Sequence, residues 1–451
     1  MSVLMLKKIS LYILFFSLPL FLCAQEEIEI SLRTRQTLAP LYLSKLASEK
    51  TDLPQSYLAE IYSIISFDCR QSGYVYLLSE DSEKEEQLAL DEERAFDPNF
   101  WNKTNAKIAV KLKLSGSVLQ IAVFHKAEQK TFHFSSPNLL GDLSADRPKI
   151  HKLLSQMQKE LFGVEGIFHK KILYSMRTKI SESAGPKWIS EIWSCDFDGK
   201  NVQQLTQEKG YCISPRFIPK RPQNFVYVSY KLGQSKIFLG SLGDKEGIHF
   251  IPLPGNQLLP SISPASDHLA FICDAAGRPD LFIQDFQANG DLSGKPKQLF
   301  SFPRATQASP TFSPDGKTIA FVSDKDGPPR IYSLTIPASA DQERPQARLI
   351  TKKNRQNTSP CWSPDGTKLA YSAKTDDVRQ IWIYDFAKEE EWQLTFAAEN
   401  MENPVWAADS MHLLFNSEGD SCELYMANIH QPEPVKISEG AGQKRFPAWE
   451  H

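Results

Sequence analysis

The sequence has few of the features that mark nucleic-acid-binding, metal-binding or hydrolytic proteins. Its charge is nearly balanced, with 51 lysines and arginines against 54 aspartates and glutamates in 451 residues. Because binding to phosphate takes clustered positive charge, this balance argues against a nucleic-acid partner and against a polybasic contact with a membrane. No Gly-x-Ser-x-Gly motif occurs, so an α/β-hydrolase domain is not expected. The sequence predicts no cofactor and no metal site, and it leaves open whether a cation occupies the channel.

Cysteines are few and show no metal-binding pattern. After the N-terminal leader described next, six remain, with no Cys-x-x-Cys spacing and no histidine at zinc-ligand distance. Most lie inside apolar, strand-like runs, so we interpret them as small buried hydrophobic residues, with disulfides as the alternative in an oxidising compartment. They are Cys69, Cys195, Cys212, Cys273, Cys361 and Cys422.

The one long apolar run lies at the N-terminus. Lys7 and Lys8 precede an apolar stretch over residues 9–22, which is the layout of a secretory signal and is too short to span a bilayer comfortably. We therefore expect residues 1–24 to be a signal peptide and the protein to be exported. Lipidation of Cys23 is the alternative, but Leu22 occupies the position where bacterial lipoproteins carry a small residue.

Internal repeats dominate the C-terminal two thirds of the chain. The pattern Ser-Pro-x-[Phe/Trp]-Ser-Pro-Asp-Gly occurs at 309–316 and again at 359–366, and weaker copies flank it. Three further β-rich runs follow each copy, so each period predicts a four-stranded meander. The leading prolines of the six copies, which we call the anchor prolines, are spaced by 43 to 50 residues: Pro215, Pro260, Pro310, Pro360, Pro404 and Pro447.

Four strands per period predict an all-β, six-bladed β-propeller over residues 168–451. The first blade lacks an anchor strand, and the anchor strand near Pro447 has nothing after it, so we expect the C-terminal strand to close the ring. In the repeated turn, Pro314 presets φ and Gly316 permits a positive φ. Tryptophans recur two residues after anchor prolines, and we interpret them as packing between blades rather than as a ligand site: Trp362, Trp406 and Trp449.

Residues 25–165 have a different pattern and predict a small α/β domain. We expect helices at 38–48, 54–65 and 147–162 and a strand pair at 107–114 and 118–125, with the acidic segment 79–94 as a solvated loop or an exposed helix face. The sequence Asp196-x-Asp198-Gly199 begins like a calcium loop, but Gln207 stands where a bidentate glutamate is needed, so we interpret it as a hairpin turn.

Several of these motifs together resemble the TolB family. They are the junction over 159–168, the strand at 172–174, the Asp-Phe-Asp-Gly turn at 196–199, the repeated Ser-Pro-Asp-Gly turns and the closing 446–449, in that order over essentially the whole mature chain. The resemblance implies a monomeric, periplasmic, non-enzymatic component of the Tol-Pal system, which supports outer-membrane integrity and cell division. It implies binding to the peptidoglycan-associated lipoprotein (Pal) through the propeller and to a TolA-like inner-membrane protein through the mature N-terminus.

Two segments are candidates for these contacts. The loops before the anchor strands gather at one mouth of the channel, and the polar ones predict a lipoprotein surface. For TolA, the resemblance falls on an alternating stretch at the mature N-terminus that could add as a strand to a partner or pack as an edge strand on its own domain. The lipoprotein candidates are Thr306, Gln307, Arg355, Gln356, Asn357, Thr358, Glu399, Asn400, Glu402 and Asn403, and the TolA-type candidates are Glu27, Ile28, Glu29, Ile30, Ser31 and Leu32.

The alternative function is a propeller enzyme whose active site lies in the central channel, as in lactonase-like or quinone-dependent enzymes. Its expected feature is a set of carboxylates or histidines that converge in the channel. No histidine recurs at one position of the repeat, so the sequence favours the scaffold.

Overall fold

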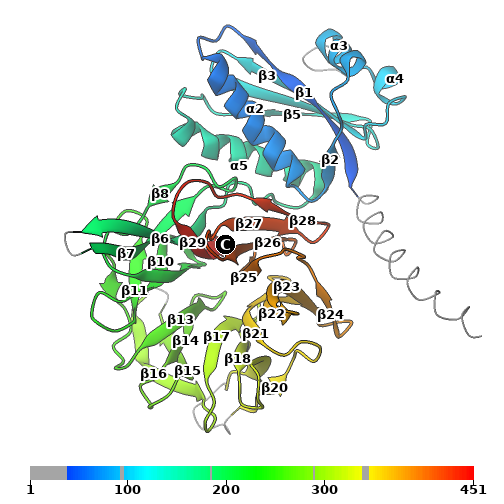
Figure 1. Cartoon of the computed structure of the whole chain (residues 1–451). Helices are drawn as coiled ribbons and strands as arrows, with labels where there is room; N and C mark the ends of the chain where they lie inside the picture. The colour runs from blue at the N-terminus through cyan, green and yellow to red at the C-terminus, as the bar shows by residue number, and fades with distance from the viewer. Residues whose placement is uncertain (1–37, 92–95, 183–184, 288–289, 338–344) are drawn as a thin grey trace, which may run out of the picture.

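A computed structural model describes residues 38–91, 96–182, 185–287, 290–337 and 345–451. The expected signal peptide and the TolA-type segment 27–32 lie outside those residues. The chain forms an N-terminal α/β part beside a six-bladed β-propeller, so the predicted fold class is confirmed (Figure 1). None of the described helices is both long and apolar enough to cross a membrane.

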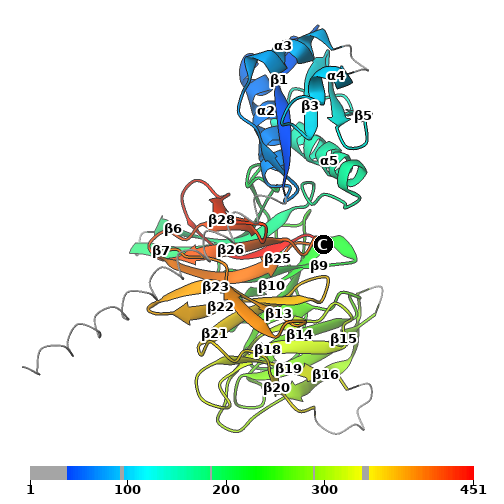
Figure 2. The same cartoon turned by 90° about the vertical axis from the view of Figure 1, so that its right-hand side faces the viewer.

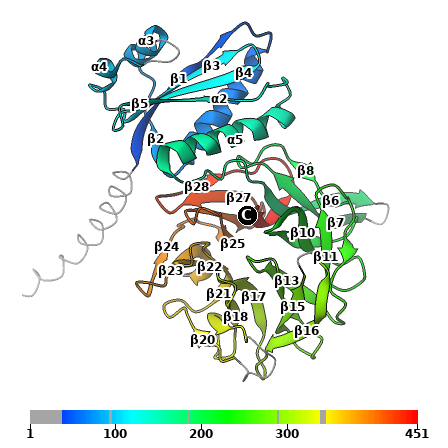
Figure 3. The same ribbon diagram turned by 180° about the vertical axis from the view of Figure 1, so that it is seen from behind.

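The N-terminal part is built on a five-stranded mixed sheet in the order β2-β1-β3-β4-β5. Helices α2 and α5 pack on the face of the sheet that looks toward the propeller, whereas α3 and α4 lie on the other face (Figures 1 and 3). The elements are β1 Ala39–Glu49, α2 Gln55–Arg70, β2 Val75–Leu77, α3 Ser82–Leu90, α4 Pro98–Trp101, β3 Ile108–Ser115, β4 Val118–His125, β5 Lys130–Ser135 and α5 Leu143–Phe162.

One predicted helix is wrong: residues 38–48 form strand β1, which pairs in parallel with both β2 and β3. Leu41 and Leu43 pack under α2 and α5, while Tyr42 packs against Trp101 on the opposite face. Because the first half of this strand, residues 40–44, is buried on both faces, it lacks the period of two that marks a half-exposed strand. The sheet environment therefore overrode the helix-like spacing of its leucines.

The other N-terminal predictions agree with the structure within a few residues. The strand pair is β3–β4, and the predicted 54–65 helix extends to Arg70. Helix α5 begins earlier than predicted, because Asp142 caps it by accepting a hydrogen bond from Ser144 N. The acidic segment contains the exposed helix α3, whereas β2, β5 and α4 were not predicted.

The propeller consists of six four-stranded antiparallel sheets arranged around a channel (Figures 1 and 2). Blade 1 is β29 Gln443–Trp449, β6 Ile172–Glu182, β7 Gly185–Cys195 and β8 Gln203–Gln204; blade 2 is β9 Cys212–Ile218, β10 Arg221–Ser229, β11 Lys236–Ser241 and β12 Ile248–His249; blade 3 is β13 Gln257–Ile262, β14 His268–Cys273, β15 Asp280–Phe286 and β16 Leu292–Phe300. Blade 4 is β17 Gln307–Phe312, β18 Thr318–Ser323, β19 Arg330–Thr335 and β20 Arg348–Leu349; blade 5 is β21 Asn357–Trp362, β22 Lys368–Thr375, β23 Val378–Asp385 and β24 Glu390–Gln393; blade 6 is β25 Asn400–Trp406, β26 His412–Glu418, β27 Leu424–Asn428 and β28 Gln431–Lys436.

The C-terminal strand closes the ring. Strand β29 pairs antiparallel with β6, so that Trp449 lies opposite Ile172 and Gln443 lies opposite Arg177. Glu450 continues the contact, because its backbone N–H donates to Lys171 O and its carboxylate accepts from Lys171 N. Blade 1 thus joins strands that are about 270 residues apart in the chain.

Every inner strand carries the same irregularity. The residue before each anchor proline has a positive φ between 46° and 57°, and the pairing register shifts at that point in all six blades. Each register shift is a β-bulge, where the regular ladder of hydrogen bonds is interrupted. Proline is tolerated at such a position because it has no N–H to donate to a neighbouring strand. The residues are Ser214, Leu259, Ser309, Ser359, Asn403 and Phe446, none of which is a glycine, so the conformation is imposed by the fold.

The repeated turns and the cysteines follow the sequence-based predictions. Gly316 and Gly366 have φ values of 71° and 74°, and the turns are held by Ser313 and Ser363, whose hydroxyls donate to the aspartates two residues later. All six cysteines of the described part of the chain are free, and all but Cys361 are buried. Burial raises the pKa of the Cys69 thiol to about 12, so it behaves as a small apolar side chain.

Candidate functional site

The predicted lipoprotein candidates lie at one end of the inner strands β17, β21 and β25. The Thr306, Arg355 and Gln356 side chains are exposed, and Thr358, Glu399, Asn400 and Glu402 are partly exposed. Each inner strand begins at this end and runs toward the Ser-Pro-Asp-Gly turns, so the loops share one mouth of the channel, which we call the loop mouth. The structure therefore brings most of the candidates to one surface over blades 4, 5 and 6.

Gln307 and Asn357 do not belong to that surface. They are the first residues of β17 and β21 and are 1% and 0% exposed. Asn357 Nδ2 donates to Thr351 Oγ1 (2.6 Å) and to Asn354 O (3.2 Å), which ties the inner strand to the preceding blade. Asn403 is also buried, where its Oδ1 accepts from Ser359 Oγ and its Nδ2 donates to Asn416 Oδ1. The amides of Asn357 and Asn403 therefore serve contacts between and within blades, whereas the buried amide of Gln307 has no hydrogen-bond partner among the described residues. The polarity of a loop sequence does not distinguish these roles from binding.

Arg379, which the sequence argument missed, organises the loop mouth. It is the second residue of β23, and its Nη1 donates to Gln356 O (2.9 Å) and Thr358 Oγ1 (3.3 Å). Its backbone N–H donates to Asn400 Oδ1 (2.7 Å), and its Nε lies 3.3 Å from Glu402. One side chain from blade 5 therefore fixes two loops that are about 45 residues apart.

A row of charges continues from Arg379 across the loop mouth. Arg445 of β29 pairs with Glu418 of β26 at 2.7 Å, and all four side chains are between 22% and 26% exposed. Burial raises the pKa of Glu402, with Glu418 adding to it and Arg379 opposing it. The row presents two ion pairs from blade 5 to blade 1, with the two glutamates side by side between the two arginines, a surface suited to a polar protein partner.

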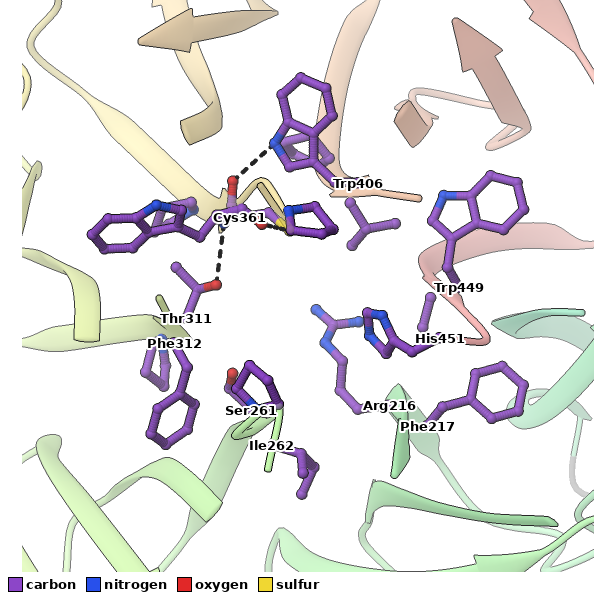
Figure 4. Close-up of a pocket in the computed structure, with 18 of the residues that line it drawn as sticks. Arg216, Phe217, Ser261, Ile262, Thr311, Phe312, Cys361, Trp406, Trp449 and His451 are labelled. Carbon is purple, nitrogen blue, oxygen red and sulfur yellow. Dashed lines mark hydrogen bonds between the residues drawn. The ribbon is translucent and has the colours of Figure 1, made fainter. Parts of the chain in front are cut away.

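The interior of the channel is walled by two alternating sets of side chains from the inner strands. Figure 4 shows Phe217, Phe312, Trp406 and Trp449 turned away from the centre, where they pack between blades. Trp406 also donates from Nε1 to Cys361 O at 3.1 Å, so the tryptophans fill the predicted packing role while they line the channel. The residues directly after the anchor prolines form the second set, which also lines the cavity: Arg216, Ser261, Thr311, Cys361, Val405 and Ala448.

These walls enclose a cavity of about 410 Å³ that extends from the bulges to the turns between the first and second strands. Its lining contains no aspartate or glutamate side chain and one histidine, His451. His451 is the last residue of the chain and is exposed, and the nearby protein atoms and the charges of Lys170 and Arg216 lower its pKa. Among the residues that the structure describes, no group of three or more histidine, cysteine and acidic side chains could hold a metal ion.

The N-terminal part docks on blades 1 and 6 beside the ring rather than over the channel (Figures 1 and 3). Phe197, from the Asp196–Gly199 turn of blade 1, is fully buried between Phe67 of α2, Phe168 and Trp449, with ring centroids 5.2 to 6.0 Å apart. Gly199 is required there, because a Cβ would lie 1.7 Å from Ile437 O. The predicted hairpin turn is therefore also the docking point of the N-terminal part.

A buried charge cluster surrounds that docking point. Asp198 forms an ion pair with Arg147 of α5, and His151 lies with its Nδ1 2.7 Å from Asp68 of α2 and its Nε2 3.7 Å from Asp198. Burial alone would lower the pKa of His151, but Asp68 and Asp198 raise it to about 10. Blade 6 adds a similar contact, in which Asp409 raises the pKa of His412 and the ring bonds to Gln71 O.

These histidines predict a pH dependence of stability. Because the folded state raises the pKa of His151 from 6.5 to about 10, its contribution is fully present below pH 6.5 and is lost as the pH rises toward 10. His412 acts in the same direction. We expect the free energy of unfolding, measured with denaturant, to fall between pH 6.5 and 9.5. Replacing the exposed His133 by asparagine should leave that slope unchanged, and a flat profile would contradict charged histidines at the interface.

Comparisons with known proteins agree with this architecture. Residues 158–451 match the family model of the TolB beta propeller domain. The chain is 42% identical to the TolB homolog of Protochlamydia amoebophila over 84% of this chain and 82% of that protein, and 36% identical to the TolB homolog of Chlamydia pneumoniae over 99% and 97%. The crystal structure of TolB from Acinetobacter baumannii covers 92% of this chain and 96% of its own, with a TM-score of 0.71 at 18% identity, which supports the fold.

Proposed function

The chain belongs to the TolB family of the Tol-Pal system, and from that premise we propose that it is a periplasmic, non-enzymatic scaffold that binds a peptidoglycan-associated lipoprotein at the loop mouth. The observation that carries the proposal is the match over 99% of the chain, because it includes the propeller and the N-terminal part together. Exposed Arg355 and Gln356 beside the row of charges at blades 5, 6 and 1 supply the polar surface.

The channel supports a scaffold better than the channel enzyme. Hydrolytic or lyase chemistry in a propeller channel needs acids, bases or metal ligands that converge on a substrate. The cavity lining offers one histidine, the exposed His451, and no carboxylate side chain. Trp362, stacked on Phe386 at 4.8 Å, and Trp406 are engaged in blade packing rather than left free for a quinone.

Charge reversal at the loop mouth tests the lipoprotein contact. Replacing the exposed Arg355 by glutamate should weaken capture of the purified lipoprotein roughly tenfold, about the loss of one charged contact, while the melting midpoint stays within error. Lys317, exposed at the turns of the opposite mouth, supplies the matched control, Lys317→Glu. Equal capture by both variants would move the contact away from the loop mouth. Asn357 is unsuitable for this test because its substitution breaks buried hydrogen bonds.

For the TolA-like partner, the proposal rests on the alternating segment 27–32 that precedes β1 in the sequence. Strand addition would use its backbone for affinity and Ile28, Ile30 and Leu32 for register. Deleting residues 25–32 should abolish binding of a TolA-type domain in a solution pull-down and leave lipoprotein capture intact or stronger. Loss of lipoprotein capture by a folded deletion variant would show that the two contacts are not separate.

A further inference from the structure

One of the six blades breaks the symmetry of the channel wall. The residue directly after the anchor proline is small or neutral in five blades, whereas blade 2 carries Arg216 at that position. Figure 4 shows the Arg216 side chain reaching into the cavity beside His451. Apart from His451, Arg216 is the one side chain of the cavity lining that carries a charge near pH 7.

Arg216 is held in place but not neutralised. Its Nη1 donates to the backbone oxygens of Pro215 (3.0 Å) and Pro447 (3.2 Å), which fixes the direction of the guanidinium. Within the part of the chain that the structure describes, its Nε and Nη2 have no hydrogen-bond partner, and no carboxylate pairs with it. Loss of solvent inside the channel lowers its pKa, yet arginine does not give up its proton in proteins. The cavity therefore contains a cation with two donors to spare.

The cavity around this cation is a fixed part of the fold. Six bulged strands with positive φ before proline form its rim, and prolines of the first turns, Pro219, Pro264, Pro314 and Pro364, line its other end. Such backbone conformations cost about 1 to 3 kcal/mol each and persist only where the surroundings impose them. A second donor in the wall, Trp449 Nε1, is buried without a partner. A volume of about 410 Å³ lies in the range of small-molecule sites.

We propose that the channel cavity binds a small organic carboxylate with a compact apolar body, whose carboxylate is bound by Arg216. A guanidinium offers two parallel N–H donors that match a carboxylate, and a low-polarity surrounding strengthens that pair. The neighbouring Ser261, Thr311, Cys361, Val405 and Ala448 are small, so they leave room for the apolar body against the wall. A cationic ligand would meet uncompensated positive charge. This site lies between the mouths of the channel and does not depend on the proposed partner contacts.

Calorimetric titration of the full mature chain tests the proposal with 4-phenylbutyrate, its neutral counterpart 4-phenylbutyramide, and inorganic phosphate. We expect the carboxylate to bind and the amide and phosphate to bind at least tenfold more weakly. In Arg216→Met the affinity for the carboxylate should fall roughly ten- to hundredfold, the loss of a charge-assisted pair. Arg216→Lys should retain part of the affinity, because lysine keeps the positive charge but lacks the two parallel N–H donors of the guanidinium.

Arg304→Met, at an exposed arginine outside the cavity lining, is the matched control and should bind 4-phenylbutyrate as the unchanged protein does. Thermal unfolding of each variant shows whether weaker binding comes from the site or from a failure to fold. If Arg216→Met does not fold stably, the affinity of Arg216→Lys is compared with that of the unchanged protein instead. Three results would overturn the proposal: no binding of 4-phenylbutyrate, equal affinity for the amide or for phosphate, or an affinity that Arg216→Met leaves unchanged.

Discussion

Removing residues 443–451, which are strand β29 and the two residues after it, should lower the melting midpoint of the protein by on the order of 10 °C or abolish cooperative unfolding. The deletion exposes an edge of β6 and removes Trp449, which is 2% exposed and packs on Phe197. Loss of a buried tryptophan alone costs about 3 to 5 kcal/mol. For domains of about 150 to 250 residues, each 1 kcal/mol shifts the midpoint by roughly 2 to 4 °C, and the shift is smaller for larger ones.

Removing His451 alone provides the control, because it leaves every β29 pairing in place. Differential scanning calorimetry of the two truncations should separate strand loss from the mere shortening of the chain. A midpoint for the 443–451 deletion equal to that of the control would contradict closure of the ring by β29.

Asp198→Ala should be the most damaging point substitution at the interface between the N-terminal part and the propeller, at about 3 to 5 kcal/mol. It removes the one carboxylate that both buried cations face, so that Arg147 keeps only the half-exposed Glu60 and His151 keeps only Asp68. The pKa of Asp198 is lowered by His151 and Arg147 in spite of burial, which shows that the folded state favours its charged form.

The matched comparison is Glu439→Gln, which removes the exposed ion pair with Lys200 on a neighbouring loop. Exposed pairs contribute about 0 to 1 kcal/mol, so this variant should unfold close to the unchanged protein. Denaturant titration with a fluorescence readout measures both. Asp198→Ala within 1 kcal/mol of Glu439→Gln would show that the buried cluster does not stabilise the docking of the N-terminal part.

The propeller could be predicted from sequence because its information is local and repeated. Each period has its own anchor proline, turn and β-rich runs. The strand assignment of any one copy is therefore supported by the same pattern in the other copies. Closure by β29 followed from counting strands, since blade 1 lacked one that the C-terminus could supply. Strand β1 was mistaken for a helix because its first half, residues 40–44, is buried on both faces and carries no alternation to recognise.

The site residues were harder to predict, because their partners are distant in the chain. The sequence indicates only a turn residue at Asp198. Its ion-pair partner, Arg147 of α5, is 51 residues away in the sequence and contacts it only in the folded protein. The sequence indicates only a solvated residue at Arg379. In the folded protein it contacts Gln356, in the loop before the inner strand of blade 5, and Asn400, the first residue of the inner strand of blade 6. Conversely, the polarity of Gln307 and Asn357 indicated a surface, whereas both are buried. Pairwise geometry of this kind leaves no signal in a single sequence.

Hydrogen exchange measured with and without the purified peptidoglycan-associated lipoprotein tests the scaffold proposal most directly. When the lipoprotein is present, we expect slower amide exchange in the loop-mouth segments 354–358 and 399–403. Exchange in the turns at 314–317 and 364–367, on the opposite mouth, should not change. No protection at any segment, or protection confined to the opposite mouth, would contradict the scaffold proposal.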